Sequence, residues 1–555
     1  MPTDPSPADP APAAGRAPGR RVLPEDADLD HLRGQCRALQ RAVRGGDPDA
    51  ARRVAVHGFA ADQGFLLSSA QLVVAREYGF AGWPRLKHHL QTIARYRWDP
   101  SEPDAVGQDA ESRADRFCRL ACLGYTPADG PDRWSRAADL LALHPDLVDL
   151  SIWAAGAAAD LAALLRHLAA DPAGPWAAAT RRGGPYRWTP LFYLVYSRLG
   201  VAARGGAGSA GTHGTVGGDA PVAARLLLDA GADPHEGYLW HGLPTPFTLL
   251  TGAFGEGEQG PLRQPRHPDS LALARQFLEA GADPSDGQAL YNRMFGTDDD
   301  HLRLLFDHGL GQGDGGPWRA RLGEALDTPQ QLLRGQLGWA VDHRQSERVR
   351  LLVEHGVDVR APFADGRTPA ARALRNGDQE LVDYLVAHGA ETPPADPVDA
   401  LLGAALAGDE PAVARLLAAH PGVAAEARAA RPSAMVWAAA NGRPGALRLL
   451  AGLGFDVNAL GRGDIPSDQP WETALHQAAA ADDVPAIRLL LELGADPPSA
   501  TGASTPLPWT GPTTSAGRRR PGSWRTEAGP TATTRTGLRS RRPGCRRPAR
   551  RYRRG

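Results

Sequence analysis

Two cysteines, Cys118 and Cys122, stand four residues apart in a segment with helical spacing, so both thiols fall on one helix face. Two thiolates could supply half of a zinc site, because structural zinc takes four Cys or His ligands. No second pair stands at the spacing that such a site needs. Since free cysteine is commonly buried, we expect both residues to be structural, with no metal bound.

Two other stretches have the residue types of a binding site. GAGSAG (Gly206–Gly211) fits a dinucleotide-binding pattern, but it follows a helical segment and not a strand. This context favours a surface insertion. The acids of TDDDHLRLL (Thr297–Leu305) are typical of a helix N-terminus, where a capping side chain and the helix dipole favour negative charge. We expect a cap here and no calcium loop.

Four histidines, His308, His355, His388 and His420, each stand at the end of an amphipathic helical segment. Such a column could carry metal or proton chemistry. Recurrence at one position is also what a structural role predicts, because imidazole can reach the last carbonyls of a helix. No acid, base and nucleophile stand together in the sequence. We therefore expect no enzymatic activity and no cofactor, and we assign no catalytic, cofactor-binding or metal residue.

The histidines lie in a sequence motif that recurs along the chain and consists of a helix end, a glycine and a turn. Copies include RLLLDAGADP (Arg225–Pro234), RLLVEHGVDV (Arg350–Val359) and RLLLELGADP (Arg488–Pro497). The glycine suits the left-handed position directly after a helix. Gly356 and Gly389 lie 33 residues apart.

A first helix precedes each copy, most clearly in DGRTPAARALRNGDQELVDYLVAHGA, where Thr368 is the expected cap and Pro369 opens the helix. ETALHQAAAADD (Glu472–Asp483) resembles the Thr-Pro-Leu-His-x-Ala signature of ankyrin repeats, with Ala474 in place of proline. The chain resembles ankyrin-repeat proteins over residues 130–497. The resemblance implies an all-α solenoid of stacked helix-turn-helix units that binds a protein through its concave surface.

The regions outside the repeats are predicted from composition and turn signals. We expect a disordered segment at 1–28, a helical N-terminal module at 29–98, a linker and helix at 99–129, the solenoid at 130–497 with insertions near 205–219 and 255–269, and a tail at 498–555. Residues 321–336 depart from the repeat and are expected to form an extra helix. The N-terminal module resembles a helical segment found ahead of bacterial ankyrin repeats, which implies a capping role. Recognition through Trp83, His88 and His89 is the alternative.

The tail differs sharply in composition from the repeats. From Thr501 onward it has 14 arginines and one acid, which predicts disorder and would permit electrostatic binding of nucleic acid. With codons that the observed residues allow, a one-base shift converts Ser499–Gly517 into VRDGRFDSTPVDWADHFGR. That string resembles an ankyrin turn and first helix. We therefore favour a frameshift near Pro498 over a nucleic-acid-binding tail.

Composition sets the expected class and compartment. The net charge is −1, four cysteines are too few for a disulfide framework, and Lys87 is the only lysine. The first 28 residues lack a signal-peptide core, and no apolar run is long enough to span a membrane. We expect a cytoplasmic, bacterial, monomeric protein.

The resemblance implies that the protein is a non-enzymatic scaffold that binds a protein partner, which the sequence does not identify. Its expected anchors are Arg367, Trp437 and Trp471, because Arg and Trp are enriched at binding hot spots. Packing of both tryptophans between helices is the alternative. The competing functions are an enzyme or effector with its site in the N-terminal module or the insertions, and nucleic-acid binding by the tail.

Overall fold

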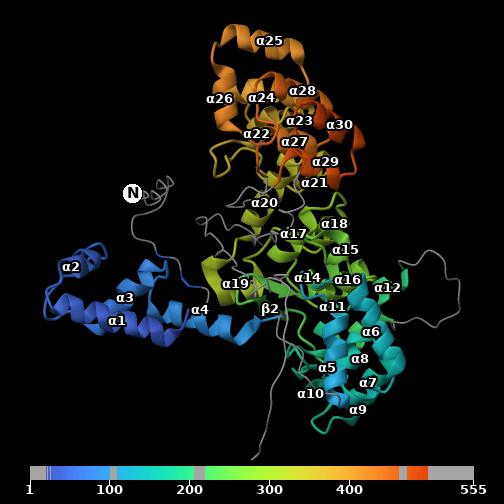
Figure 1. Ribbon diagram of the computed structural model, residues 1–555. Coiled ribbons are helices and arrows are strands. Elements are labelled where there is room, and N and C mark those ends of the chain that lie inside the picture. Colours follow the sequence, from blue (N-terminus) through green and yellow to red (C-terminus); the bar gives the residue numbers. More distant parts are fainter. Residues whose placement is uncertain are drawn as a thin grey trace, which may run out of the picture. The chain divides into compact units, whose positions relative to one another are not determined.

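The computed structural model describes residues 21, 23–24, 27–100, 109–204, 219–394, 396–461 and 472–497. This part of the chain is mostly helical, as predicted (Figure 1). None of its helices is long and apolar enough to cross a membrane. The glycine-rich stretch 206–211, Trp471 and the tail 498–555 lie outside the described residues.

The N-terminal module contains four helices around a core of its own. They are α1 (Leu29–Arg44), α2 (Pro48–Ala55), α3 (Leu67–Glu77) and α4 (Trp83–Tyr96). Asp47 ends the turn between the first two, because its carboxylate accepts from the backbone N–H groups of Asp49 and Ala50 at 2.8 and 3.0 Å. His89 is buried against Phe80, whereas His88 is exposed.

The described residues after this module contain nine helix pairs, which Figure 1 colours in chain order from cyan to orange-red. The first helices are α8 (Ile152–Ala157), α11 (Pro190–Tyr196), α14 (Leu249–Phe254), α17 (Gly287–Met294), α20 (Pro329–Asp342), α22 (Pro369–Arg375), α24 (Pro397–Ala407), α27 (Ala434–Ala440) and α29 (Ala474–Ala480). The second helices are α9 (Leu161–Ala170), α13 (Ala220–Asp229), α16 (Ser270–Glu279), α18 (Asp300–Asp307), α21 (Ser346–Glu354), α23 (Gln379–Ala387), α25 (Glu410–Ala419), α28 (Pro444–Gly452) and α30 (Val484–Glu492). From α8 to α24 each first helix packs on the next one, and the pairs from α8 to α23 share one cluster of buried apolar residues.

Further helices precede or interrupt the pairs. They are α5 (Ala110–Ala121), α6 (Pro131–Leu143), α7 (Leu147–Leu150), α10 (Pro175–Ala179), α12 (Leu199–Arg204), α15 (Gly260–Arg263), α19 (Gly316–Leu322), the 3-10 turn η1 (Gly323–Ala325) and α26 (Val423–Ala430). Residues 321–336 are not one extra helix, and that prediction was wrong. The extra helix α19 ends at Leu322, and Thr328 begins α20 with a capping box to Gln331, so α20 belongs to the next repeat.

The predicted caps of the repeats are confirmed. Gly356, Gly389, Gly454 and Gly494 follow second helices with φ of 77°, 97°, 79° and 94°. The Thr368 hydroxyl accepts from the N–H of Ala371 at 3.2 Å. These local bonds define where each helix starts and stops.

The column of histidines occupies helix ends, as the structural interpretation predicts. His388 Nδ1 lies 2.8 Å from the carbonyl oxygen of Tyr384. His355 stacks on Phe306 with ring centroids 3.8 Å apart, so it joins one second helix to the preceding one. His308 and His420 also stand at C-cap positions.

A short three-stranded sheet was not predicted. Its strands are β1 (Arg97–Trp98), β2 (Gly237–Trp240) and β3 (Pro246–Thr248). Strand β1 pairs in parallel with β2, which pairs antiparallel with β3. Aromatic side chains, which favour strands, cover it: Trp98 lies against Trp188 and Phe247 at centroid distances of 4.7 and 6.1 Å.

The buried core is divided in the C-terminal repeats. One cluster of buried residues extends to Ala390, and a second begins at Leu401 and continues to Ala495. The extra helix α26 follows Gly422 and packs against α24, which also contacts α28. The regular succession of first helices is interrupted at this point.

Candidate functional site

Two consecutive repeats end in almost the same seven residues, GADPHEG (Gly231–Gly237) and GADPSDG (Gly281–Gly287). Each opens with a glycine at positive φ, 99° and 102°. The aspartate two residues later makes an Asx turn: Asp233 accepts from the N–H of His235 at 2.9 Å, and Asp283 from that of Ser285 at 2.8 Å. The sequence thus builds the same turn twice, and both turns present an acid at the sixth position.

That sixth residue joins each turn to the start of the first helix that precedes it in the chain. Glu236 accepts a hydrogen bond from the hydroxyl of Thr189, the cap of α11, and Asp286 accepts one from Thr248, the cap of α14. Asp286 also caps α17 by accepting from the N–H of Ala289 at 2.9 Å. Sequence analysis missed this arrangement, although the repeated G-A-D-P-x-[E/D]-G pattern was available to signal it.

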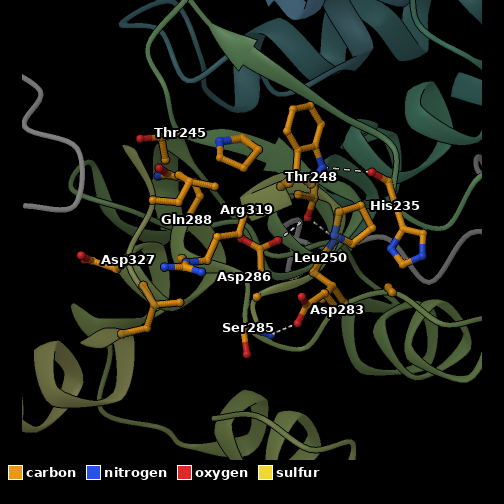
Figure 2. A pocket seen from close by; sticks show the side chains of 18 of the residues that line it. His235, Thr245, Thr248, Leu250, Asp283, Ser285, Asp286, Gln288, Arg319 and Asp327 are labelled. Carbon is orange, nitrogen blue, oxygen red and sulfur yellow. Dashed lines mark hydrogen bonds between the residues drawn. The ribbon is translucent and has the colours of Figure 1, made fainter. Parts of the chain in front are cut away.

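A pocket lies at the second of these turns (Figure 2). Its walls are residues 234–235, 245–250, 282–288 and 315–332, so two repeat turns, strand β3 and the extra helix α19 all contribute. Trp318 fixes α19 to the first turn, because its indole N–H donates to the His235 carbonyl oxygen at 3.0 Å. The cavity measures about 70 Å³, well below the roughly 300–1,000 Å³ of typical cofactor pockets.

Asp286 is the buried acid of this pocket. Figure 2 shows the Thr248 hydroxyl directed at its carboxylate, and the Thr251 hydroxyl lies 3.4 Å from both of its oxygens. Burial raises the pKa of Asp286 to about 6, although the hydrogen bonds from Thr248 and Ala289 oppose that rise. Burial also raises the pKa of Glu236 in the first turn.

Three buried polar atoms lining the same pocket have no hydrogen-bond partner: Gln288 Oε1, Ser285 Oγ and Arg319 Nε. The amide nitrogen of Gln288 donates to Asn292 at 2.7 Å, so the orientation of that amide is set and its oxygen is left free. Buried polar groups are rarely unpaired, because each costs about 1–3 kcal/mol. The pocket therefore offers one acceptor and two donors to an incoming group.

The residues expected to contact a partner lie elsewhere. Trp437 is 7% exposed and donates its indole N–H to the Asp342 carbonyl oxygen at 2.8 Å, so its prediction as an exposed anchor was wrong and the packing alternative holds. Arg367 makes a two-point ion pair with Asp399 at 2.9 and 3.2 Å. Its guanidinium already has a carboxylate partner from α24. Trp471 lies outside the described residues.

The acids at 298–300 stand at the N-terminus of α18, as expected, with Asp300 in the first turn, but the expected side-chain capping bond does not form. Asp299 occupies the N-cap without a capping bond and instead accepts from Arg348 at 2.5 Å. Asp298 accepts from Arg293 and Asp300 from Arg266, both at 2.6 Å. Ligand atoms of Asp298, Asp300 and His301 lie within 4.8 Å of one another, but the positive charges beside them oppose a bound cation.

Cys118 and Cys122 are buried and unpaired with each other, as the structural interpretation predicts. Burial raises the pKa of Cys118 well above its ordinary value and that of Cys122 to about 12. Both are therefore protonated thiols at neutral pH, a form that is a poor nucleophile.

Comparison with known families matches two segments of the chain. Residues 332–396 match the model "Ankyrin repeats (3 copies)", and residues 471–502 match "Ankyrin repeat". The chain contains ankyrin repeats. The helix pairs from α8 to α18, including the pocket turns, precede the first matched segment. They are assigned to the same stack because each first helix packs on the next one.

Comparison with whole proteins adds little. The crystal structure of the human ASB11 ankyrin repeat domain is 21% identical and covers 41% of this chain and 88% of that chain. Its TM-score is 0.16, and the superposition therefore carries no argument. No curated protein matches.

Proposed function

We propose that this ankyrin-repeat chain is a non-enzymatic scaffold that binds a protein partner along the edge formed by its repeat turns. The observation that supports this most directly is the pocket between the turns Gly231–Gly237 and Gly281–Gly287. Successive turns of a repeat stack lie side by side, so one partner can contact several of them. The cavity has the size for one side chain of that partner.

The site has the mixed character of a protein interface. Apolar side chains, Pro246, Leu250 and Leu332, line it beside acids and an arginine. Interface anchors commonly fill such partly apolar pockets. We place this scaffold in a bacterial cytoplasm as a monomer, on the composition of the chain and its low cysteine content.

A photocrosslinking experiment in the native host tests the proposal. A photoreactive residue replaces His235 in the first turn, and in a matched variant it replaces Glu347, an exposed acid on the second helix α21. We expect one protein to crosslink at His235 and not at Glu347. Equal crosslinking at both positions, or none at either, would remove the support for turn-edge binding, and turnover of a small molecule by the purified chain would favour the enzymatic alternative.

A further inference from the structure

The pocket beside α19 has an excess of negative charge. Three of its lining residues are acids, Asp283, Asp286 and Asp327, and its basic lining residues are Arg319 and His235. Arg319 donates to the Asp314 carbonyl oxygen at 3.3 Å, and no ion pair joins it to an acid in the described part of the chain. Asp283 and Asp286 therefore have no ion pair with Arg319.

The most buried polar residues of the pocket, Gln288 and Asp286, offer hydrogen-bond acceptors to a ligand. Gln288 is 1% exposed, and its Oε1 is without a partner. The Asp286 carboxylate accepts from Thr248, Thr251 and Ala289, and an ionised carboxylate offers about four lone-pair sites. A donor-rich, positively charged group would satisfy both residues at once.

Resting on the proposed function, we propose that this pocket receives an arginine side chain of the partner protein, with its guanidinium on Asp286 and Gln288. A guanidinium presents five N–H donors in a rigid fork, so it can donate to two separate acceptors, which suits a pocket lined by both a carboxylate and an amide oxygen better than the single point charge of lysine does. The apolar walls, Pro246, Leu250 and Leu332, can cover the methylene stem.

The remaining unpaired atoms indicate that the arginine belongs to a peptide. Ser285 Oγ and Arg319 Nε are donors, and a guanidinium has no acceptor for them. Backbone carbonyl oxygens on either side of the arginine would supply those acceptors. The cavity of about 70 Å³ admits a guanidinium head, since one water needs about 10–15 Å³ on this measure.

Peptide pools test the assignment on the full-length chain. Four pools of nonapeptides carry arginine, citrulline, lysine or glutamate at the centre, with randomised flanks, and peptides retained by the immobilised protein are quantified by mass spectrometry. Citrulline keeps the shape of arginine and removes its charge. We expect arginine to be enriched about tenfold or more over citrulline, and over lysine by less, because charge-assisted bidentate bonds are strong and directional.

Variants link the preference to the pocket. Asp286→Asn and Gln288→Met should each reduce the arginine enrichment at least about fivefold. Glu236→Gln is the matched control, because Glu236 has the same place in the preceding turn, is equally buried and does not line the pocket; it should keep the enrichment. Thermal melts establish that each variant is folded.

Each remaining outcome overturns the assignment. Equal retention of arginine and citrulline, enrichment of glutamate, or failure to retain any pool would each show that the pocket does not select a cationic side chain. The same holds if a folded Asp286→Asn variant retains the full arginine preference. The crosslinking at His235 is independent of these results, so the scaffold function can stand when the arginine assignment fails.

Discussion

The hydroxyl of Thr248 donates to the carboxylate of Asp286, 38 residues further along the chain. One bond thus joins the cap of a first helix to the turn that ends the same repeat and begins the next. Thr189 and Glu236 repeat the relationship at a separation of 47 residues. In both cases a residue that caps its own helix also holds the neighbouring turn in place.

Removing the Thr248 hydroxyl should therefore destabilise the fold. Thr248→Val leaves the buried Asp286 carboxylate without that donor and removes the side-chain cap of α14, so we expect a loss of about 1–3 kcal/mol in urea unfolding. Thr248→Ser keeps the hydroxyl and is the control. Equal stability of the valine and serine variants would show that the bond contributes nothing.

Asp286 predicts a defined pH dependence of stability. Its folded pKa of about 6 lies above the unfolded value, so the folded state holds its proton more tightly. Its contribution to folding is then favourable at low pH and is lost as the pH rises from about 4 to about 6. The whole change between those two limits is roughly 3 kcal/mol, and repulsion from Asp283 is one of the causes of the shift.

The variant Asp286→Asn should remove that dependence. We expect urea midpoints that change less between pH 4 and 7 than those of the wild type, and a more stable protein at pH 7. Glu236→Gln serves as the comparison, since burial raises that pKa as well. A variant that is more stable and yet loses arginine binding would identify Asp286 as a binding residue kept at the expense of stability. Parallel pH profiles for wild type and variant would contradict the shifted pKa.

Gly389 tests the repeat caps. Its φ is 97°, and an added Cβ would lie 3.0 Å from Nη2 of Arg360. Gly389→Val should destabilise the protein by more than about 1 kcal/mol, because a β-branched residue is poorly tolerated at positive φ. Gly452→Val is the matched control, since Gly452 ends α28 and an added Cβ would meet open space. An unchanged melting temperature for the Gly389 variant would argue against this cap.

The composition of the tail leads to a further prediction. If the frame shifts near Pro498, deleting residues 498–555 should leave the melting temperature unchanged, and restoring the alternative frame should raise it. Val484 and Leu491 on the last described helix, α30, are 46% and 44% exposed, and a further repeat would cover such side chains. Resequencing that finds the frame intact would defeat this explanation and revive nucleic-acid binding by the arginines.

The parts of the fold that sequence predicts are those that local residues determine. Gly389 and Thr368 cap helices through backbone conformation and bonds within a few residues of themselves. The helix starts and ends of the repeats could therefore be predicted from the sequence. The sheet could not, because Trp98 pairs with Trp240 across more than a hundred intervening residues. Long-range pairing leaves no local pattern where the strands are two to four residues long.

The candidate site was hidden for a related reason. Trp437 has the residue type of an interface anchor, but burial depends on the helices around it, which composition does not reveal. The pocket needs α19 beside two turns that lie 50 residues apart. The recurrence of an acid after G-A-D-P could have drawn attention to Asp286, whereas the unpaired Oε1 of Gln288 could be found only in three dimensions.

The division of the core between Ala390 and Leu401 has a consequence for cooperativity. Repeat stacks lose stability interface by interface, and a junction without a shared apolar core favours separate opening of the blocks on its two sides. The C-terminal block, from α24 to α30, carries the terminal repeat, where fraying starts. The junction is held by polar bonds, such as those from Arg367 to Asp399 and from Trp437 to Asp342, and not by shared apolar burial. We therefore expect local unfolding that starts in this block to break those bonds before it reaches the turns that form the pocket.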